Sequence, residues 1–183
     1  GIGQINVGRA INEIGVEQFI YASTSETYQL PDKIPTSEDV SLVVPDPMNP
    51  RYSYGGGKIF GELLTLHHVK NVKTKKIFRP HNIYGPNMGQ DHVIPQFVKK
   101  IQLSAQTGKL EIQGDGSETR SFCHIEDAIN GIRLIQEKGS SGIYHLGSGI
   151  ENTILNLANK LQDLMKIDAE ILTGLLTEGS VKR

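Results

Sequence analysis

The sequence is poor in the residues that mark secreted, membrane and nucleic-acid-binding proteins. It has one cysteine, Cys123, and no tryptophan, so it can form no internal disulfide and no cysteine-based zinc site. No apolar run approaches the roughly 20 residues that a membrane span requires. The formal net charge of -1 offers no excess of basic residues to nucleic acid or an anionic membrane. We therefore expect a cytoplasmic protein with neither partner.

What the sequence does contain is an alternation of helix-like and strand-like segments. Its 183 residues, 37% of them hydrophobic, are enough to bury a substantial core. Helical apolar spacing predicts helices at 5–14, 53–69, 93–106, 124–139 and 153–167. Short apolar runs predict strands at 17–23, 75–80, 109–113, 142–149 and 168–174. The alternation favours an α/β fold with a mostly parallel sheet, and a proline-rich loop at 29–51 is long enough to suggest a function.

Two glycine-rich stretches resemble phosphate-binding loops, but the residues around them exclude that interpretation. "GIGQINVG" at 1–8 has no strand before it, as a dinucleotide-binding fingerprint requires. "YGGGK" at 54–58 lacks the spacing of a P-loop, and Ile59 follows the lysine where a P-loop has Ser or Thr. Glycine-rich phosphate binding is therefore not predicted by any segment present.

The second of these stretches carries a different pattern, a tyrosine and a lysine four residues apart. Positions i and i+4 share one face of a helix, so Tyr54 and Lys58 should project side by side. An ammonium group beside a phenol favours the phenolate and lowers the tyrosine pKa, which brings the phenol closer to working as a base. The pair alone is better explained as a surface Tyr and Lys at the start of a glycine-weakened helix. Upstream, however, Ser23, Thr24 and Glu26 follow a buried strand, where ligands bind in open α/β sheets.

Five motifs in order then resemble one family. "YASTSETY" (21–28), "YGGGK" (54–58), "RPHNIYGP" (79–86), "GDGSETRSFCHIEDA" (114–128) and "IYHLGSG" (143–149) are similar to successive motifs of the extended short-chain dehydrogenase/reductases, specifically the NAD-dependent nucleotide-sugar epimerases and dehydratases. The resemblance implies a partial Rossmann-like doubly wound parallel sheet with a smaller α/β substrate-binding domain. Residues 1–82 would belong to the NAD-binding domain and 83–183 mainly to the nucleotide-sugar-binding part, with about 120–150 returning to the first.

The resemblance also implies roles for individual residues. Tyr54 would deprotonate a sugar hydroxyl while hydride passes to the nicotinamide of NAD, Lys58 would hold the nicotinamide ribose and lower the tyrosine pKa, and Thr24 would hydrogen-bond the same hydroxyl. The implied cofactor contacts are Ala22, Ser23, Tyr54, Lys58 and His81. The implied substrate contacts are Thr24, Asn82, Val93, Ile94, Leu110, Ile112 and Arg120. Arg79, outside these sets, is open to a purely structural role at a strand end.

The motifs leave three reactions open: decarboxylation, dehydration and epimerisation. "STSE" at 23–26 resembles UDP-glucuronate decarboxylases and differs by one residue from the "STDE" of dTDP-glucose 4,6-dehydratases, and epimerases with "STSE" are similar too. All three would work through a 4-keto sugar, and Glu26 would act as acid or base in a second step. Two rival hypotheses are a catalytically silent nucleotide-sugar- and NAD-binding scaffold of the same fold, and an NADP-dependent reductase of a small carbonyl compound.

The resemblance carries three further expectations. Members of the family begin with a glycine-rich strand-to-helix turn, so about 80 to 100 residues of the cofactor-binding half would precede Gly1 in a longer enzyme, and more chain would follow Arg183. The helix with Tyr54 and Lys58 commonly packs against its copy, which implies a homodimer with 5–15 as the companion helix. A UDP-, dTDP- or similar nucleotide-sugar substrate implies a place in polysaccharide biosynthesis.

Overall fold

The structure is a computed structural model that describes residues 1–29 and 31–175. The chain forms two compact units, neither of which is a single continuous segment. The first contains Gly1–His81 and Glu126–Leu146, and the second contains Asn82–Ile125 and the residues from Gly147 onward.

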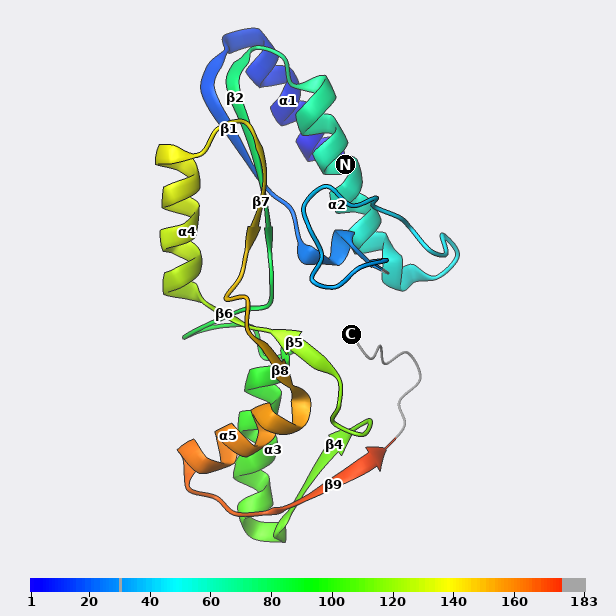
Figure 1. The fold of residues 1–183 in the computed structure, drawn as a ribbon, viewed down its shortest axis with the longest axis vertical. Coiled ribbons are helices and arrows are strands. Elements are labelled where there is room, and N and C mark those ends of the chain that lie inside the picture. Colours follow the sequence, from blue (N-terminus) through cyan, green and yellow to red (C-terminus); the bar gives the residue numbers. More distant parts are fainter. Residues whose placement is uncertain (30, 176–183) are drawn as a thin grey trace. The chain divides into compact units, whose positions relative to one another are not determined.

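A parallel three-stranded sheet lies at the centre of the first unit (Figure 1). Its strands are β1 (Val16–Ala22), β2 (Val72–Pro80) and β7 (Gly142–Leu146), in the order β1-β2-β7. Ala22 pairs with Phe78, and Pro80 pairs with Leu146, so all three strands run toward the same edge. This confirms the parallel sheet expected from the sequence.

Helices cover both faces of this sheet (Figure 1). On one face lie α1 (Ile2–Ile14) and α2 (Ser53–Leu63), and on the other lies α4 (Ile125–Lys138). Alternate residues of β2 point to opposite faces: the Lys76 ammonium donates to the carbonyls of Ile135 and Gln136 on α4, both at 2.8 Å, whereas Arg79 pairs with Glu62 on α2. The first unit is therefore a doubly wound, Rossmann-like α/β layer structure.

Short irregular elements flank α2 and follow β1. A 3₁₀ turn, η2 (Pro50–Tyr52), leads into α2 and is capped by the Asn49 side chain. After Leu63 the helix continues as the π-helical turn η3 (Leu64–His68). A second 3₁₀ turn, η1 (Ser25–Thr27), follows β1 directly. The helix expected over 53–69 thus has the right extent but changes its hydrogen-bond pattern in the last turn.

The second unit is built on α3 (Val93–Thr107) and α5 (Ile154–Met165), packed with the parallel pair β4 (Lys109–Gln113) and β9 (Glu170–Leu175). Two further pairs complete it: β3 (Ile83–Tyr84) with β6 (Cys123–His124), parallel, and β5 (Thr119–Ser121) with β8 (Glu151–Thr153), antiparallel. These four strands have two or three residues each and were not expected from the sequence. Such short segments give too few residues for a period to be recognised.

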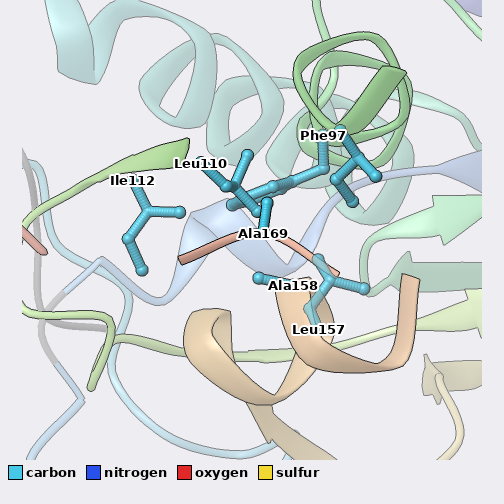
Figure 2. Packing of buried hydrophobic residues seen from close by; sticks show 7 residues of the cluster. Phe97, Leu110, Ile112, Leu157, Ala158 and Ala169 are labelled. Atoms are coloured by element: carbon cyan, nitrogen blue, oxygen red, sulfur yellow. The ribbon is translucent and has the colours of Figure 1, made fainter. Parts of the chain in front are cut away.

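The core of the second unit is a cluster of apolar side chains from α3, β4 and α5 and the approach to β9 (Figure 2). Leu110 and Ile112 belong to this cluster, each with 1% of its surface exposed, because alternate residues of β4 face inward. The other buried members are Phe97, Ile101, Leu157, Ala158 and Ala169.

No helix in the described part of the chain, residues 1–29 and 31–175, is both long enough and apolar enough to cross a membrane.

Candidate active site

The carboxyl end of β1 is held in a defined shape by the residues that follow it. Ser23 donates its backbone N–H to the Phe78 carbonyl at 2.8 Å, which extends the β1-β2 ladder by one bond. Thr24 then caps η1: its hydroxyl accepts from the Glu26 backbone N–H at 3.3 Å, and its carbonyl accepts from the Thr27 hydroxyl at 2.8 Å. Thr24 is buried and Glu26 is exposed. The turn therefore fixes Thr24 and leaves Glu26 accessible.

Tyr54 and Lys58 lie on α2, one turn apart, beside this strand end. The Lys58 ammonium donates to the Ala22 carbonyl at 2.7 Å. The same nitrogen lies 5.8 Å from the centroid of the Tyr54 ring and 5.4 Å from that of Tyr21. Tyr54 keeps 54% of its surface exposed. Lys58 thus contacts β1 at Ala22, two residues before Thr24, and the exposed Tyr54 ring lies close to the Lys58 ammonium.

The three glycines between Tyr54 and Lys58 have different surroundings. A Cβ on Gly55 would lie 2.7 Å from the Glu26 carbonyl oxygen and would collide with the Gln29 amide. One on Gly56 would touch Val44 at 3.3 Å, and one on Gly57 would meet nothing within 4 Å. Gly55 therefore allows the start of α2 to approach the turn that carries Glu26, and the space beside Gly57 is open within this chain.

Behind Tyr54 and Lys58 lies a buried ion pair between Glu62 of α2 and Arg79 of β2. Nε of Arg79 donates to Oε1 of Glu62 at 2.9 Å, and Nη2 donates to Oε2 at 2.7 Å. The side chains are only 2% (Arg79) and 4% (Glu62) exposed. Burial by itself lowers the pKa of Arg79, but hydrogen bonds and charge from Glu62 and Tyr28 outweigh it and raise that pKa above its ordinary value.

This ion pair continues into a chain of hydrogen bonds toward the 29–51 loop. Arg79 also donates to the Tyr28 hydroxyl at 2.6 Å and to the Glu38 backbone carbonyl at 3.0 Å. The Tyr28 hydroxyl in turn hydrogen-bonds Nε2 of His145 on β7. The His145 backbone N–H donates to the Glu38 carboxylate at 3.1 Å. The loop is thereby attached to the ends of two strands.

His81, at the end of β2, lies against His145 with an edge-to-face ring contact at 5.5 Å. Its backbone N–H donates to the Leu146 carbonyl at 2.8 Å. Burial, followed by repulsion from His145, lowers the pKa of His81. Burial also lowers the pKa of His145, with Glu38 opposing and Arg79 reinforcing the change. Both rings thus favour the neutral form.

The remaining implied site residues belong to the second unit. The exposed Asn82 donates its amide to the Ser121 carbonyl at 3.0 Å and accepts the Cys123 N–H at 3.0 Å. Arg120, in β5, donates from Nη1 to the neighbouring Thr119 carbonyl at 2.7 Å. Val93 and Ile94 are half-buried at the start of α3. Asn82 is attached by its hydrogen bonds to the segment just after Arg120.

Leu110 and Ile112 are a different case from the other implied substrate contacts. Both side chains fill the core of the second unit and have no exposed face to offer a nucleotide. A strand with alternating apolar residues looks the same in sequence whether its apolar face meets a ligand or a core. The structure therefore argues for a packing role at these two positions.

The structure brings four further residues to this strand end that were not predicted from the sequence, namely Tyr28, Glu38, Glu62 and His145. One signal was available for Glu62: it follows Lys58 by four residues, as Lys58 follows Tyr54, so all three share one face of the helix. Tyr28 and Glu38 are far from His145 in the sequence and meet it only through the strand order.

The parallel sheet, the covering helices and the Tyr-x-x-x-Lys helix beside a strand end define a Rossmann-like α/β fold. The family model for "NAD dependent epimerase/dehydratase family" matches residues 1–147, so the chain belongs to that family.

Individual relatives match over most of this chain. The chain is 31% identical to the bovine (Bos taurus) dTDP-D-glucose 4,6-dehydratase over 86% of this chain and 42% of the relative. It is 31% identical to UDP-glucuronic acid decarboxylase 6 of Arabidopsis thaliana over 93% and 49%, respectively. The structure of UDP-glucuronic acid 4-epimerase from Bacillus cereus, in complex with UDP-glucuronic acid and NAD, matches with a TM-score of 0.80 and 28% identity over 99% of this chain and 56% of that one. The chain spans less than half the length of these two curated relatives.

Proposed function

We propose that this chain is part of an NAD-dependent enzyme that modifies a nucleotide-sugar, as an epimerase, dehydratase or decarboxylase, through a 4-keto sugar. The observation that carries the proposal is the attachment of Lys58 to the Ala22 carbonyl at 2.7 Å with Tyr54 exposed beside it. This arrangement brings a phenol, an ammonium and the end of a parallel strand together, which is where ligands bind in this class of fold. The relatives' activities, as dehydratase, decarboxylase and epimerase, support the same set of reactions.

The residues at the strand end suit a bound NAD. Ala22 is exposed, the space beside Gly57 is open, and Lys58 offers a cation at the same edge. We infer that Ala22, Tyr54, Lys58 and His81 would contact the cofactor, which supplies a hydride acceptor when bound. Ser23 fits less well as a direct contact, because it is buried and donates its hydroxyl to Glu62.

The proton chemistry would fall to the chain's own residues. Tyr54 takes a proton from a sugar hydroxyl, and the Lys58 ammonium stabilises the phenolate that serves as base. Thr24 hydrogen-bonds the same sugar hydroxyl from the strand end. Glu26 is the acid or base of a second step, and its exposure on the turn after Thr24 fits this role. Dehydration or decarboxylation would need such a group, but epimerases with "STSE" carry the same residue, so Glu26 does not separate the three reactions.

Substrate binding is proposed for the second unit, with NAD binding in the first. Asn82 and Arg120 would hold the diphosphate, since guanidinium and amide donors suit phosphate oxygens. Val93 and Ile94, half-buried at the start of α3, would lie near the base and ribose. A diphosphate clamp also distinguishes this proposal from reduction of a small neutral carbonyl compound. We place the enzyme in the cytoplasm and in polysaccharide biosynthesis, where nucleotide-sugars are consumed.

A second copy of the chain is the proposed protein partner. One stripe of α1 is exposed and made of apolar or small residues spaced four and three apart, and α2 has a partly exposed stripe with the same spacing. Such spacing is typical of helix-helix seams. The stripes are Gly3, Val7, Ala10 and Ile14 on α1, and Gly56, Phe60 and Leu63 on α2. We infer a homodimer through these two helices.

The test is to incubate the full-length protein with NAD and a panel of UDP-, dTDP-, GDP- and CDP-sugars and to identify the products by mass. Loss of water, loss of carbon dioxide, or a new stereoisomer of unchanged mass assigns the reaction. Tyr54→Phe removes only the phenol oxygen and should lower turnover at least about 100-fold, the lower range for a general base. Turnover retained in Tyr54→Phe would refute the assignment, and NAD binding without any turnover would favour the scaffold alternative.

A further inference from the structure

Glu62 shares a helix face with Tyr54 and Lys58 but differs from them in burial. The three residues follow one another at intervals of four on α2. Tyr54 is exposed, whereas Glu62 keeps only 3% of its surface. A carboxylate buried to this degree is unfavourable unless it is paired and hydrogen-bonded. Its partners therefore show what the position is built for.

Those partners come from two adjacent strands. Arg79 of β2 donates two parallel hydrogen bonds to the carboxylate, a strong and directional arrangement. The Ser23 hydroxyl, directly after β1, donates to Oε1 of the same group. Arg79 thereby fixes the Glu62 carboxylate in place. The fixed carboxylate in turn holds the Ser23 hydroxyl.

Helix α2 is consequently tied to the end of β1 at two consecutive residues. Lys58 binds the Ala22 carbonyl at 2.7 Å, and Glu62, one turn later, binds the Ser23 hydroxyl. Thr24 follows immediately. Two attachments one helical turn apart restrict rotation of the helix about the strand end as well as its distance from it, which a single bond would not do.

We propose that Glu62 is a positioning residue, which sets the placement of Thr24 relative to Tyr54 and Lys58 by holding Ser23 against α2 with Arg79 as its counter-ion. The inference rests on the proposed function of that site and adds a residue to it. Its role differs from simple stabilisation, because a buried ion pair contributes little net stability compared with apolar residues of similar volume. In this protein the ion pair holds the Glu62 carboxylate in a fixed orientation toward Ser23.

The experiment compares three variants of the full-length protein. Ser23→Ala removes the hydroxyl and leaves the ion pair intact, and Glu62→Gln removes the charge that Arg79 requires. Glu17→Gln is the matched control: Glu17 forms an exposed pair with Lys73 at the opposite end of the same two strands, at 2.8 Å. Steady-state kinetics gives kcat and KM, and hydrogen exchange of peptides covering residues 20–28 reports the strand end without requiring turnover.

Ser23→Ala and Glu62→Gln should each lower kcat about 10- to 100-fold with KM for the nucleotide-sugar within about twofold, because small misplacements of reacting groups have effects of this size. Exchange at 20–28 should be faster in both and unchanged in Glu17→Gln. Wild-type kcat in a folded Ser23→Ala would overturn the inference, even if its exchange were faster, since the role would then be structural only. If Glu62→Gln does not fold, Ser23→Ala decides alone.

The two proposals fail separately. If Tyr54→Phe keeps its turnover, the proposed function is wrong. Independently of turnover, a wild-type rate of hydrogen exchange at residues 20–28 in Ser23→Ala would overturn the positioning role of Glu62. If Tyr54→Phe is inactive while Ser23→Ala and Glu62→Gln match the wild type, only the role of Glu62 is wrong.

Discussion

Alanine should stabilise the chain at Gly57 but not at Gly55, although the two residues lie in the same helix. Glycine in a helix interior costs about 1 kcal/mol relative to alanine, so each substitution starts from a similar gain. At Gly57 the new Cβ meets nothing within 4 Å, and the gain is kept. At Gly55 it lies 2.7 Å from the Glu26 carbonyl oxygen, which belongs to the backbone and cannot rotate away.

The magnitudes follow from these contacts. Forcing an extra methyl into a packed site costs about 1–3 kcal/mol, so Gly55→Ala should be unchanged to about 2 kcal/mol less stable once the helix gain is subtracted. Gly57→Ala should be about 1 kcal/mol more stable. For a chain of 183 residues, each kcal/mol corresponds to a shift in Tm of about 2–4 °C. The two variants should therefore differ in Tm by several degrees.

Thermal unfolding followed by far-ultraviolet circular dichroism measures both variants beside the wild type. Gly55→Ala should also lower kcat, because its Cβ pushes on the turn that carries Thr24 and Glu26. Equal stabilisation by both alanines would refute the close approach at Gly55. Destabilisation by Gly57→Ala would refute the open space at that position.

Two further predictions concern pH and assembly. Because the pKa of His81 and of His145 is lowered in the folded chain, the unfolded chain binds more protons below the ordinary histidine pKa of 6.5, so the free energy of unfolding should fall as pH falls from about 7 to about 5. In denaturant titrations, the free energy of unfolding of His81→Phe should depend less on pH, while the control His67→Gln, at an exposed position, should keep the wild-type dependence. A wild-type free energy of unfolding that does not change over this pH range would contradict the reasoning. In sedimentation, Val7→Glu and Phe60→Glu should each turn the proposed dimer into monomer, while Leu164→Glu, at an exposed position of α5, should leave it intact. Dimers that persist in both Val7→Glu and Phe60→Glu would exclude this interface.

The sequence was sufficient to predict the parts of the site that depend on local spacing. Tyr54 and Lys58 were expected on one helix face, and Thr24 and Glu26 after a strand, because helix and strand periods determine both. The expectation that this strand is buried was wrong, since every residue of β1 is half-buried or exposed. The parallel sheet followed from the alternation of elements and is confirmed.

What could not be predicted depends on contacts between distant segments. The Glu62–Arg79 pair requires α2 to lie over β2, and Tyr28 meets His145 only because β7 joins the sheet beside β2. The special need for glycine at position 55, and not at 57, depends on where the turn after β1 lies. None of these placements leaves a periodic signal in the sequence.

The discontinuous order of the two units has a consequence for how the chain folds during synthesis. β2 must pair with β7, yet residues 82–125 of the other unit are made between them. The sheet of the first unit can therefore not be completed until residue 146 has been made, and until then the β2 edge that β7 will occupy is unpaired. Exposed edges of this kind are prone to association with other chains. Expression trials that truncate the chain before β7 should accordingly give aggregated protein, although such truncations keep every proposed catalytic residue.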